Sequence, residues 1–326
     1  MARSAQALRV PTFSVTKRDA ILASLTGAAA AQLRRRARES SDLQFAALLS
    51  LPVLAFLLLV VAYPLGYALW MSFHDIRFFG GYRADFVGLK NYVAVFADSA
   101  FWHSALVSIR FTVESVILTL LVGLGLALTL NSAARKQQWL RAIVIAPWAV
   151  SPYGVGILFS YMGRGQTGLG TYVAMALGLK TTVNFLQSNI IVEVLAVGNA
   201  WNMAPLVAFF LLANMTAIPT RLYDLAAIDR MTRWETFSHV TLPPLRFTLF
   251  VFACIVTVFS LKAFDYVFTV ARGGPGDASA VLTYQLYKIS FVNLDLGYGA
   301  AMSFFLLAMI LVATTLIYLV WGRVEA

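Results

Sequence analysis

The chain has 326 residues, of which 60% are hydrophobic and only 12% are charged, and its mean hydropathy is +0.76. These values exclude an ordinary soluble globular protein and predict an integral membrane protein. The formal net charge of +10 lies mostly beside apolar segments and not in a folded basic domain, so nucleic-acid binding is not expected. Long apolar runs without alternating polar residues favour an all-α protein over a β-barrel.

Residues 1–45 differ from the rest of the chain because they are strongly basic. A short Ala-rich apolar piece is followed by Arg34, Arg35, Arg36 and Arg38. A cleavable signal peptide would place its basic residues before the apolar run. The segment is therefore predicted to be a cytoplasmic tail that lies near anionic lipid.

Six segments are apolar over about 20 residues, the length that a helix needs to cross a bilayer. The predicted spans cover residues 46–73, 102–131, 139–162, 190–217, 246–270 and 297–321. Together they form one transmembrane domain, 46–326. Sixteen Lys and Arg fall on the side of the N-terminus against seven on the other side, which predicts that both termini are cytoplasmic.

Charged and polar residues inside spans are costly, so they are candidates for function. In the second span Arg110 and Glu114 have the i, i+4 spacing of an ion pair. In the fourth span Asn199 and Asn202 share a helix face beside Trp201, a combination that suits sugar hydroxyls and the apolar face of a pyranose. Hydrogen bonds between helices are the alternative role for the two asparagines.

Residues 219–243 form a polar segment between the fourth and fifth spans. Thr220 is predicted to cap a first short helix, and Thr232 with Glu235 has the spacing of a capping box for a second one. Pro243 and Pro244 are predicted to end that second helix. The segment thus reads as two short helices joined by a turn at Arg230-Met231, on the cytoplasmic face of the membrane.

The fifth span carries Lys262 and Asp265 at i, i+3, a spacing that allows a second internal ion pair. A sharper hypothesis is that Lys262 or Arg110, as a cation deep within a span, neutralises an anionic ligand. The three histidines show no metal-ligand spacing, so no metal site is predicted.

The polar segment resembles the "EAA" loop of permease subunits of binding-protein-dependent ABC importers. Its pattern is matched at Asp224, Leu225, Ala226, Asp229, Phe237, Val240 and Leu242-Pro243. Arg230 stands where the family usually has Gly, and Met231 where it has Ala. The stretches "AYPLGYALWMSFHD", "FVGLKNYVAVFAD" and "AFDYVFTVARGGPG" are similar to the carbohydrate-uptake branch, so that the resemblance covers about residues 45–321.

The resemblance implies a type I importer permease fold and a non-enzymatic role. No G-x-x-x-x-G-K-[ST] sequence occurs, so the chain needs no nucleotide cofactor of its own, and ATP-Mg belongs on a separate ATPase dimer. The implied partners are that ATPase, a second homologous permease, an external solute-binding protein, a sugar or sugar derivative and the lipid of a bacterial inner membrane. ATPase coupling is implied for Asp224, Leu225, Ala226, Asp229, Arg230, Arg233, Glu235 and Phe237.

Two alternatives stay open at this point. An ion-coupled secondary transporter would transport alone and would usually show an inverted repeat with two broken spans. Pro205 is the one clear break in the sequence, and no repeat is visible. A purely structural membrane subunit would need no loop of this kind. The EAA-like pattern favours the importer over both.

Overall fold

The computed structural model describes residues 44–77, 83–133, 138–179, 182, 184–187 and 189–321. The predicted tail 1–45 therefore lies almost entirely outside the described residues. The chain divides into two compact units, 1–67 and 68–326. The first apolar helix, Gln44–Ser72, belongs mainly to the first unit; it includes a π-helical turn, Leu57–Ala62, and ends as α2, Tyr63–Ser72.

Helices make up nearly all of the second unit. Its long helices are α4 (Ser99–Ala133), α8 (Ile191–Ala217), α11 (Leu242–Leu261) and α14 (Leu296–Trp321). Its shorter helices are α3 (Lys90–Ala97), α5 (Gln138–Ala149), α6 (Pro152–Met162), α7 (Leu169–Ala176), α9 (Thr220–Ile228), α10 (Arg233–Thr236), α12 (Asp265–Ala271) and α13 (Leu282–Tyr287). A two-stranded antiparallel sheet, β1 (His74–Arg77) with β2 (Arg83–Phe86), precedes α3, and Asp75 pairs with Asp85.

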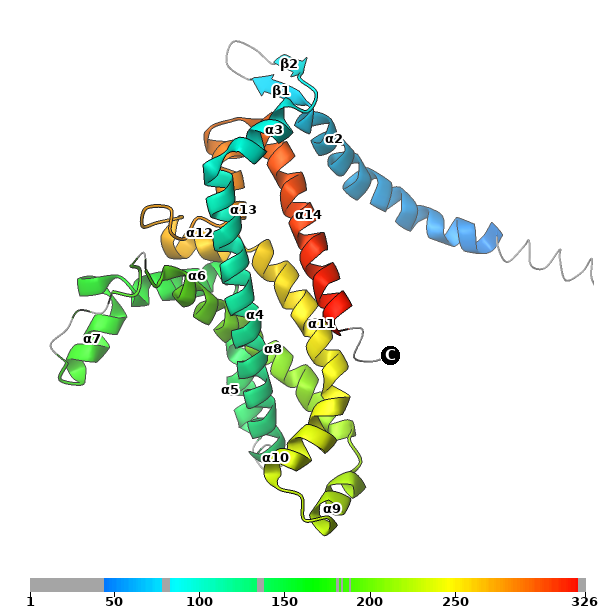
Figure 1. The fold of residues 1–326 in the computed structure, drawn as a ribbon, viewed down its shortest axis with the longest axis vertical. Helices are drawn as coiled ribbons and strands as arrows, with labels where there is room; N and C mark the ends of the chain where they lie inside the picture. The colour runs from blue at the N-terminus through cyan, green and yellow to red at the C-terminus, as the bar shows by residue number, and fades with distance from the viewer. Residues whose placement is uncertain are drawn as a thin grey trace, which may run out of the picture. The chain divides into compact units, whose positions relative to one another are not determined.

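Five of the helices in the described part of the chain are long and apolar enough to cross a membrane, and six if α5 and α6 count as one span. Figure 1 shows α4, α8 and α11 side by side, with α9 and α10 at one end and the β1–β2 sheet with α3 at the other. The prediction of an all-α protein with about six spans is thus confirmed. The ends of α8 and α14 agree with the predicted spans to within one residue.

The core of the second unit forms where α4 packs along α8. Leu195 and Ala196 of α8 are completely buried against Phe111 of α4 near one end, and Val207 and Leu211 of α8 are buried with Ala127 further along. Gly123 permits the close approach, because a Cβ at this position would lie 2.8 Å from Cβ of Val207. Small residues serve this purpose between membrane helices, where packing replaces the hydrophobic effect.

The third predicted span is not one straight helix. The chain turns by 90° between α5 and α6. Pro147 and Pro152 lack the N–H groups that would continue the helix ladder across this point. Ser151 caps α6 by accepting a hydrogen bond from the N–H of Gly154 at 3.2 Å. The predicted span 139–162 thus corresponds to two helices, α5 and α6, that meet at a sharp bend.

The helix that covers most of the fifth predicted span, 246–270, has different ends from that span. It begins earlier, because α10, a π-helical turn (Phe237–Thr241) and α11 form one continuous helix, Arg233–Leu261. Pro243 and Pro244 therefore do not end the second helix as expected. The extra residue in the π-helical turn relieves the clash that a proline ring makes with the preceding helix turn.

At its other end this span stops before the predicted limit. The helix ends at Leu261, and α12 begins separately at Asp265. The carbonyl of Ala263 in the break accepts a hydrogen bond from the Thr283 hydroxyl at 2.9 Å, so a residue of a later segment satisfies the interrupted backbone.

Candidate functional site

The first predicted short helix of the polar segment is present as α9, whereas the second is the beginning of the continuous helix Arg233–Leu261. The helix α9 ends in a left-handed residue, Arg230, with φ of 56°. The N–H of Met231 donates to the carbonyl of Ala226 at 2.9 Å, and that of Arg230 to Ala227 at 3.1 Å. This pair of bonds defines a Schellman motif. Arg230 thus adopts the conformation for which the family pattern uses Gly.

The capping box at the start of α10 is confirmed. The Thr232 hydroxyl accepts from the N–H of Glu235 at 3.3 Å, and the Glu235 carboxylate accepts from the N–H of Thr232 at 2.7 Å. The other predicted cap was wrong: Pro219 precedes α9, and Thr220 is its first residue and makes no capping bond.

Two contacts attach α9 to the continuous helix. The hydroxyls of Tyr223 and Thr241 lie 3.2 Å apart, and Ala226 is only 3% exposed. Of the apolar positions in this segment, Ala226 therefore packs inward. Five large apolar side chains of the segment are exposed, namely Leu222, Leu225, Ile228, Met231 and Trp234.

Charged side chains surround this exposed apolar surface. Asp224, Asp229, Arg230 and Arg233 are all exposed, and within the described part of the chain none of them forms an ion pair. Ile228 and Trp234 are 75% and 73% exposed. Phe237 is half-buried and packs on Trp234, with ring centroids 5.6 Å apart. An apolar centre with a charged rim is the composition of a protein-binding surface.

The predicted ion pair in the second span is present, and it has an additional member. Nε of Arg110 lies 2.8 Å from Oε1 of Glu114, and the same guanidinium also pairs with Glu193 at the start of α8. Sequence spacing did not indicate Glu193, because it lies 83 residues from Arg110. The sequence signal for Glu193 was that a carboxylate stands near the start of an apolar span, where charged residues are costly.

The second predicted pair is absent. Among the described residues no ion pair joins Lys262 to Asp265, because the helix ends at Leu261 and the i, i+3 spacing no longer places them on one helix face. The ammonium group of Lys262 instead lies 4.5 Å from the ring centroid of Phe259. Asp265 begins α12, where a carboxylate is favourable.

The two asparagines of α8 both bond to other helices. Nδ2 of Asn202 donates to the carbonyls of Pro147 and Val150, at 2.7 and 3.0 Å. It therefore supplies a donor to the carbonyl of Val150 and a second donor to that of Pro147, which also accepts from the N–H of Val150 at 3.2 Å. Nδ2 of Asn199 donates to Oγ of Ser260 at 3.0 Å. These contacts match the alternative role predicted for the asparagines.

Trp201 differs from its asparagine neighbours. It is 40% exposed, and its ring centroid lies 6.2 Å from that of Phe159. The indole of Trp201 therefore remains accessible, in contrast to the buried Asn202.

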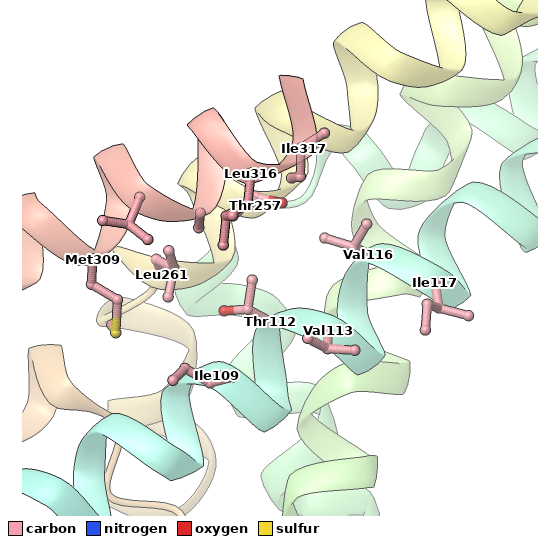
Figure 2. A pocket seen from close by; sticks show the side chains of 12 residues that line it. Ile109, Thr112, Val113, Val116, Ile117, Thr257, Leu261, Met309, Leu316 and Ile317 are labelled. Atoms are coloured by element: carbon pink, nitrogen blue, oxygen red, sulfur yellow. The ribbon is translucent and has the colours of Figure 1, made fainter. Parts of the chain in front are cut away.

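An apolar groove of about 420 Å³ opens between α4, α11 and α14. Figure 2 shows Val113 of α4 and Leu261, Met309 and Leu316 around it. None of the six predicted pathway residues lines it. Two threonine hydroxyls are its polar side-chain groups, which are too few for a sugar, whose many hydroxyls require hydrogen-bond partners. Among the described residues no group of three or more His, Cys, Asp or Glu is placed to hold a metal ion.

The helical bundle with its exposed helix pair defines a multi-pass membrane transport subunit. The chain belongs to the family described as binding-protein-dependent transport system inner membrane component, which matches residues 119–325. It is therefore a permease subunit of the inner membrane. Membership of this family gives no support to the ion-coupled secondary transporter.

Characterised relatives cover most of the chain. It is 34% identical over 279 residues to a trehalose/maltose transport system permease protein of Thermococcus litoralis, covering 85% of this chain and 92% of that protein. It is 29% identical over 273 residues to a sulfoquinovosyl glycerol transport system permease protein of Agrobacterium fabrum (84% and 89%). It is 31% identical over 253 residues to an sn-glycerol-3-phosphate transport system permease protein of Brucella suis (77% and 86%). These relatives are permease proteins and not enzymes.

Solved structures share the fold. A chain of a bacterial ABC transporter that imports the acidic polysaccharide alginate superposes with a TM-score of 0.76 at 20% identity, over 90% of this chain and all of that one. The same kind of transporter in complex with an alginate-bound periplasmic protein gives 0.73 at 20% identity, over 87% and 96%. The prediction of a type I importer permease fold is confirmed.

Proposed function

We propose that this chain forms half of the translocation pathway of an ATP-driven importer for a sugar or sugar derivative. Several relatives carry names that refer to trehalose, maltose, sulfoquinovosyl glycerol and glycerol phosphate. The observation that carries the proposal is the exposed surface of α9 and α10, which is apolar, charged at its rim and tied to a long helix.

The proposed partners follow from the same surface and the family. A dimer of ATPase subunits, which binds ATP-Mg, docks on α9 and α10. A second, homologous permease completes the pathway, and an external solute-binding protein delivers the solute. Both termini and the segment 219–243 lie in the cytoplasm, in agreement with the excess of Lys and Arg on that side.

The continuous helix supplies a physical route for coupling. The helix Arg233–Leu261 has 29 residues, which gives a length of about 43 Å at 1.5 Å per residue. A displacement imposed at Trp234 is therefore transmitted along one helix as far as Lys262. The capping box and the contact of Tyr223 with Thr241 keep the docking surface rigid against it.

The coupling residues have distinct roles in this proposal. Leu225 enters an apolar groove of the ATPase, while Asp224, Asp229, Arg230 and Arg233 bind polar groups around that groove. The other three act from within: Ala226 and Phe237 support the surface by packing, and Glu235 supports it through its capping bonds.

For the pathway, we propose that Trp201 and Lys262 contact the solute directly. Both are accessible, and Lys262 has no carboxylate partner among the described residues. Asn199, Asn202, Arg110 and Asp265 then maintain the walls of the pathway.

The test compares two matched variants of the assembled complex in liposomes. Ile228→Glu places a charge in the exposed apolar surface, and Leu177→Glu makes the same change at a position that is 73% exposed after α7. ATP-driven uptake of labelled maltose, trehalose and glycerol 3-phosphate with the solute-binding protein is expected to be lost only in Ile228→Glu. Uptake that persists without ATP, or equal losses in both variants, would contradict the proposal.

A further inference from the structure

A half-polar pocket lies at the opposite end of α6 from its bend. It has a volume of about 590 Å³ and is bordered by the end of α6, by α12 and by the loop after α12. This volume falls within the range of about 300–1,000 Å³ that small-molecule sites occupy. Two cations line it, Arg164 beyond α6 and Arg272 at the end of α12. The sequence patterns discussed above did not indicate either arginine.

Arg164 and Arg272 have no carboxylate partner among the described residues, in contrast to Arg110 with its two glutamates. Arg164 donates to the Ser160 hydroxyl at 3.5 Å, and the guanidinium of Arg272 lies 5.5 Å from the ring centroid of Phe268. Two positive charges therefore border one recess with their hydrogen-bond donors largely unused.

Two carbonyls in the pocket wall already accept hydrogen bonds. The carbonyl of Ala271 accepts from the N–H of Gly274 at 2.9 Å, and the carbonyl of Gly274 accepts from the Ser279 hydroxyl at 2.7 Å. The hydroxyl of Thr269 donates to the carbonyl of Asp265 at 2.8 Å. Unused donors remain on both guanidinium groups, and such donors match a ligand that is negatively charged and accepts hydrogen bonds.

The helix dipoles give a partial explanation for these cations. Each arginine follows the C-terminus of a helix, where a positive charge is favourable by about 0.3–1 kcal/mol. That effect explains a cation at each terminus taken alone. It does not require that the two side chains border the same recess, and it leaves their donors available.

We infer that this pocket binds the oxyanion of a small solute, a carboxylate, sulfonate or phosphate group on a sugar derivative, between Arg164 and Arg272. The planar guanidinium groups match the two-oxygen edge of such a group. The inference rests on the proposed function for its orientation, which places the pocket on the external side, where it would concentrate anionic solute at the entrance.

The experiment measures protection of individual arginines in the assembled transporter in nanodiscs. Phenylglyoxal modifies accessible arginines, and peptide mass spectrometry reads each one separately. Glucuronate at constant ionic strength is expected to slow the modification of Arg164 and Arg272, and glucose is expected to have no effect. Arg246, which is exposed and borders a different, apolar groove, serves as the internal control.

Variants test whether the two arginines act together. In Arg164→Gln, the glucuronate concentration that halves the modification rate of Arg272 should rise about tenfold, because a charge-assisted contact is lost. Arg164→Lys should retain part of the protection, and Arg246→Gln should change nothing. These readouts do not need transport activity, so they are independent of the uptake assay that tests the proposed function.

Three results would overturn the inference. Equal protection of Arg246 would show a bulk ionic effect. Absence of protection by glucuronate at all concentrations would show that the pocket binds no such group. Protection by the solute-binding protein without solute, but not by glucuronate, would assign the arginines to protein docking instead.

Discussion

The side-chain amide of Asn202 in α8 donates a hydrogen bond of 2.7 Å to the carbonyl oxygen of Pro147 in α5. A second bond from the same nitrogen reaches the carbonyl of Val150 at 3.0 Å. Asn202 is 7% exposed, so both bonds lie in the interior of the bundle. One amide thus holds together the bend between α5 and α6.

Replacing this amide is expected to destabilise the chain. Asn202→Asp keeps the size of the side chain but removes both donors, and it leaves two carbonyls beside a carboxylate. The expected loss is about 1–3 kcal/mol, the cost of buried unsatisfied polar groups. Thermal unfolding of the purified complex measures it, with the half-exposed Val197→Ala on the same helix as control. A variant with native stability but impaired sugar uptake would instead indicate a role in solute binding.

Arg110 should matter more for stability than either of its partners. Arg110→Met leaves Glu114 and Glu193 facing each other without a cation, whereas Glu114→Gln or Glu193→Gln leaves one ion pair intact. Because the side chains are 51%, 27% and 45% exposed, solvent screens them, and each glutamate variant should cost no more than about 1 kcal/mol. A double-mutant cycle for Arg110 and Glu193 measures their coupling. Zero coupling would show that the pair contributes nothing.

Arg230→Gly is expected to raise the stability of the chain. Arg230 has φ of 56°, a conformation that costs a non-glycine residue about 1 kcal/mol and costs glycine almost nothing. Arg233→Gly, in the first turn of α10, should lower stability because it replaces a good helix former. Thermal unfolding compares the two variants, and a change in the same direction for both would contradict the assignment of strain to Arg230. If Arg230→Gly also reduces ATP-driven uptake, the Arg230 side chain contributes to binding of the ATPase.

Two neighbouring glycines of α4 provide a matched pair. A Cβ at Gly123 would lie 2.8 Å from Cβ of Val207, while a Cβ at Gly125 meets nothing within 4 Å. Gly123→Ala should therefore destabilise the contact of α4 with α8 by about 1–3 kcal/mol through overpacking. Gly125→Ala should be neutral or slightly stabilising because alanine favours the helix. Equal effects on the unfolding temperature would contradict the predicted contact.

Lys262 carries the hypothesis of charge recognition in the pathway, because Arg110 is already held by two carboxylates. Lys262→Gln should reduce uptake of glycerol 3-phosphate or a sulfonated sugar more than uptake of a neutral sugar. Lys90→Gln, at an exposed position of α3, is the control. Equal losses for charged and neutral solutes would contradict the hypothesis.

The sequence by itself determined the features that depend on nearby residues or on the membrane. Apolar runs indicated the spans because crossing the bilayer demands about 20 apolar residues. The capping box of Thr232 with Glu235 and the pair of Arg110 with Glu114 join residues within one helical turn, so their spacing was sufficient. The EAA-like pattern indicated the family for the same reason, since its positions lie in one short segment.

Only the tertiary structure decided the contacts between helices. Sequence spacing carries no information about which group an amide will reach once helices pack. The hydrogen bonds from Asn202 to the bend and from Asn199 to Ser260 therefore follow only from the tertiary structure. The same holds for Glu193, which joins Arg110 only because α4 lies along α8. The surrounding packing also decides where helices continue and where they break. The helix Arg233–Leu261 continues through two prolines, and it ends at Leu261 where the Thr283 hydroxyl bonds to the backbone of the break. Neighbouring groups thus satisfy backbone bonds that local propensity predicts to be lost.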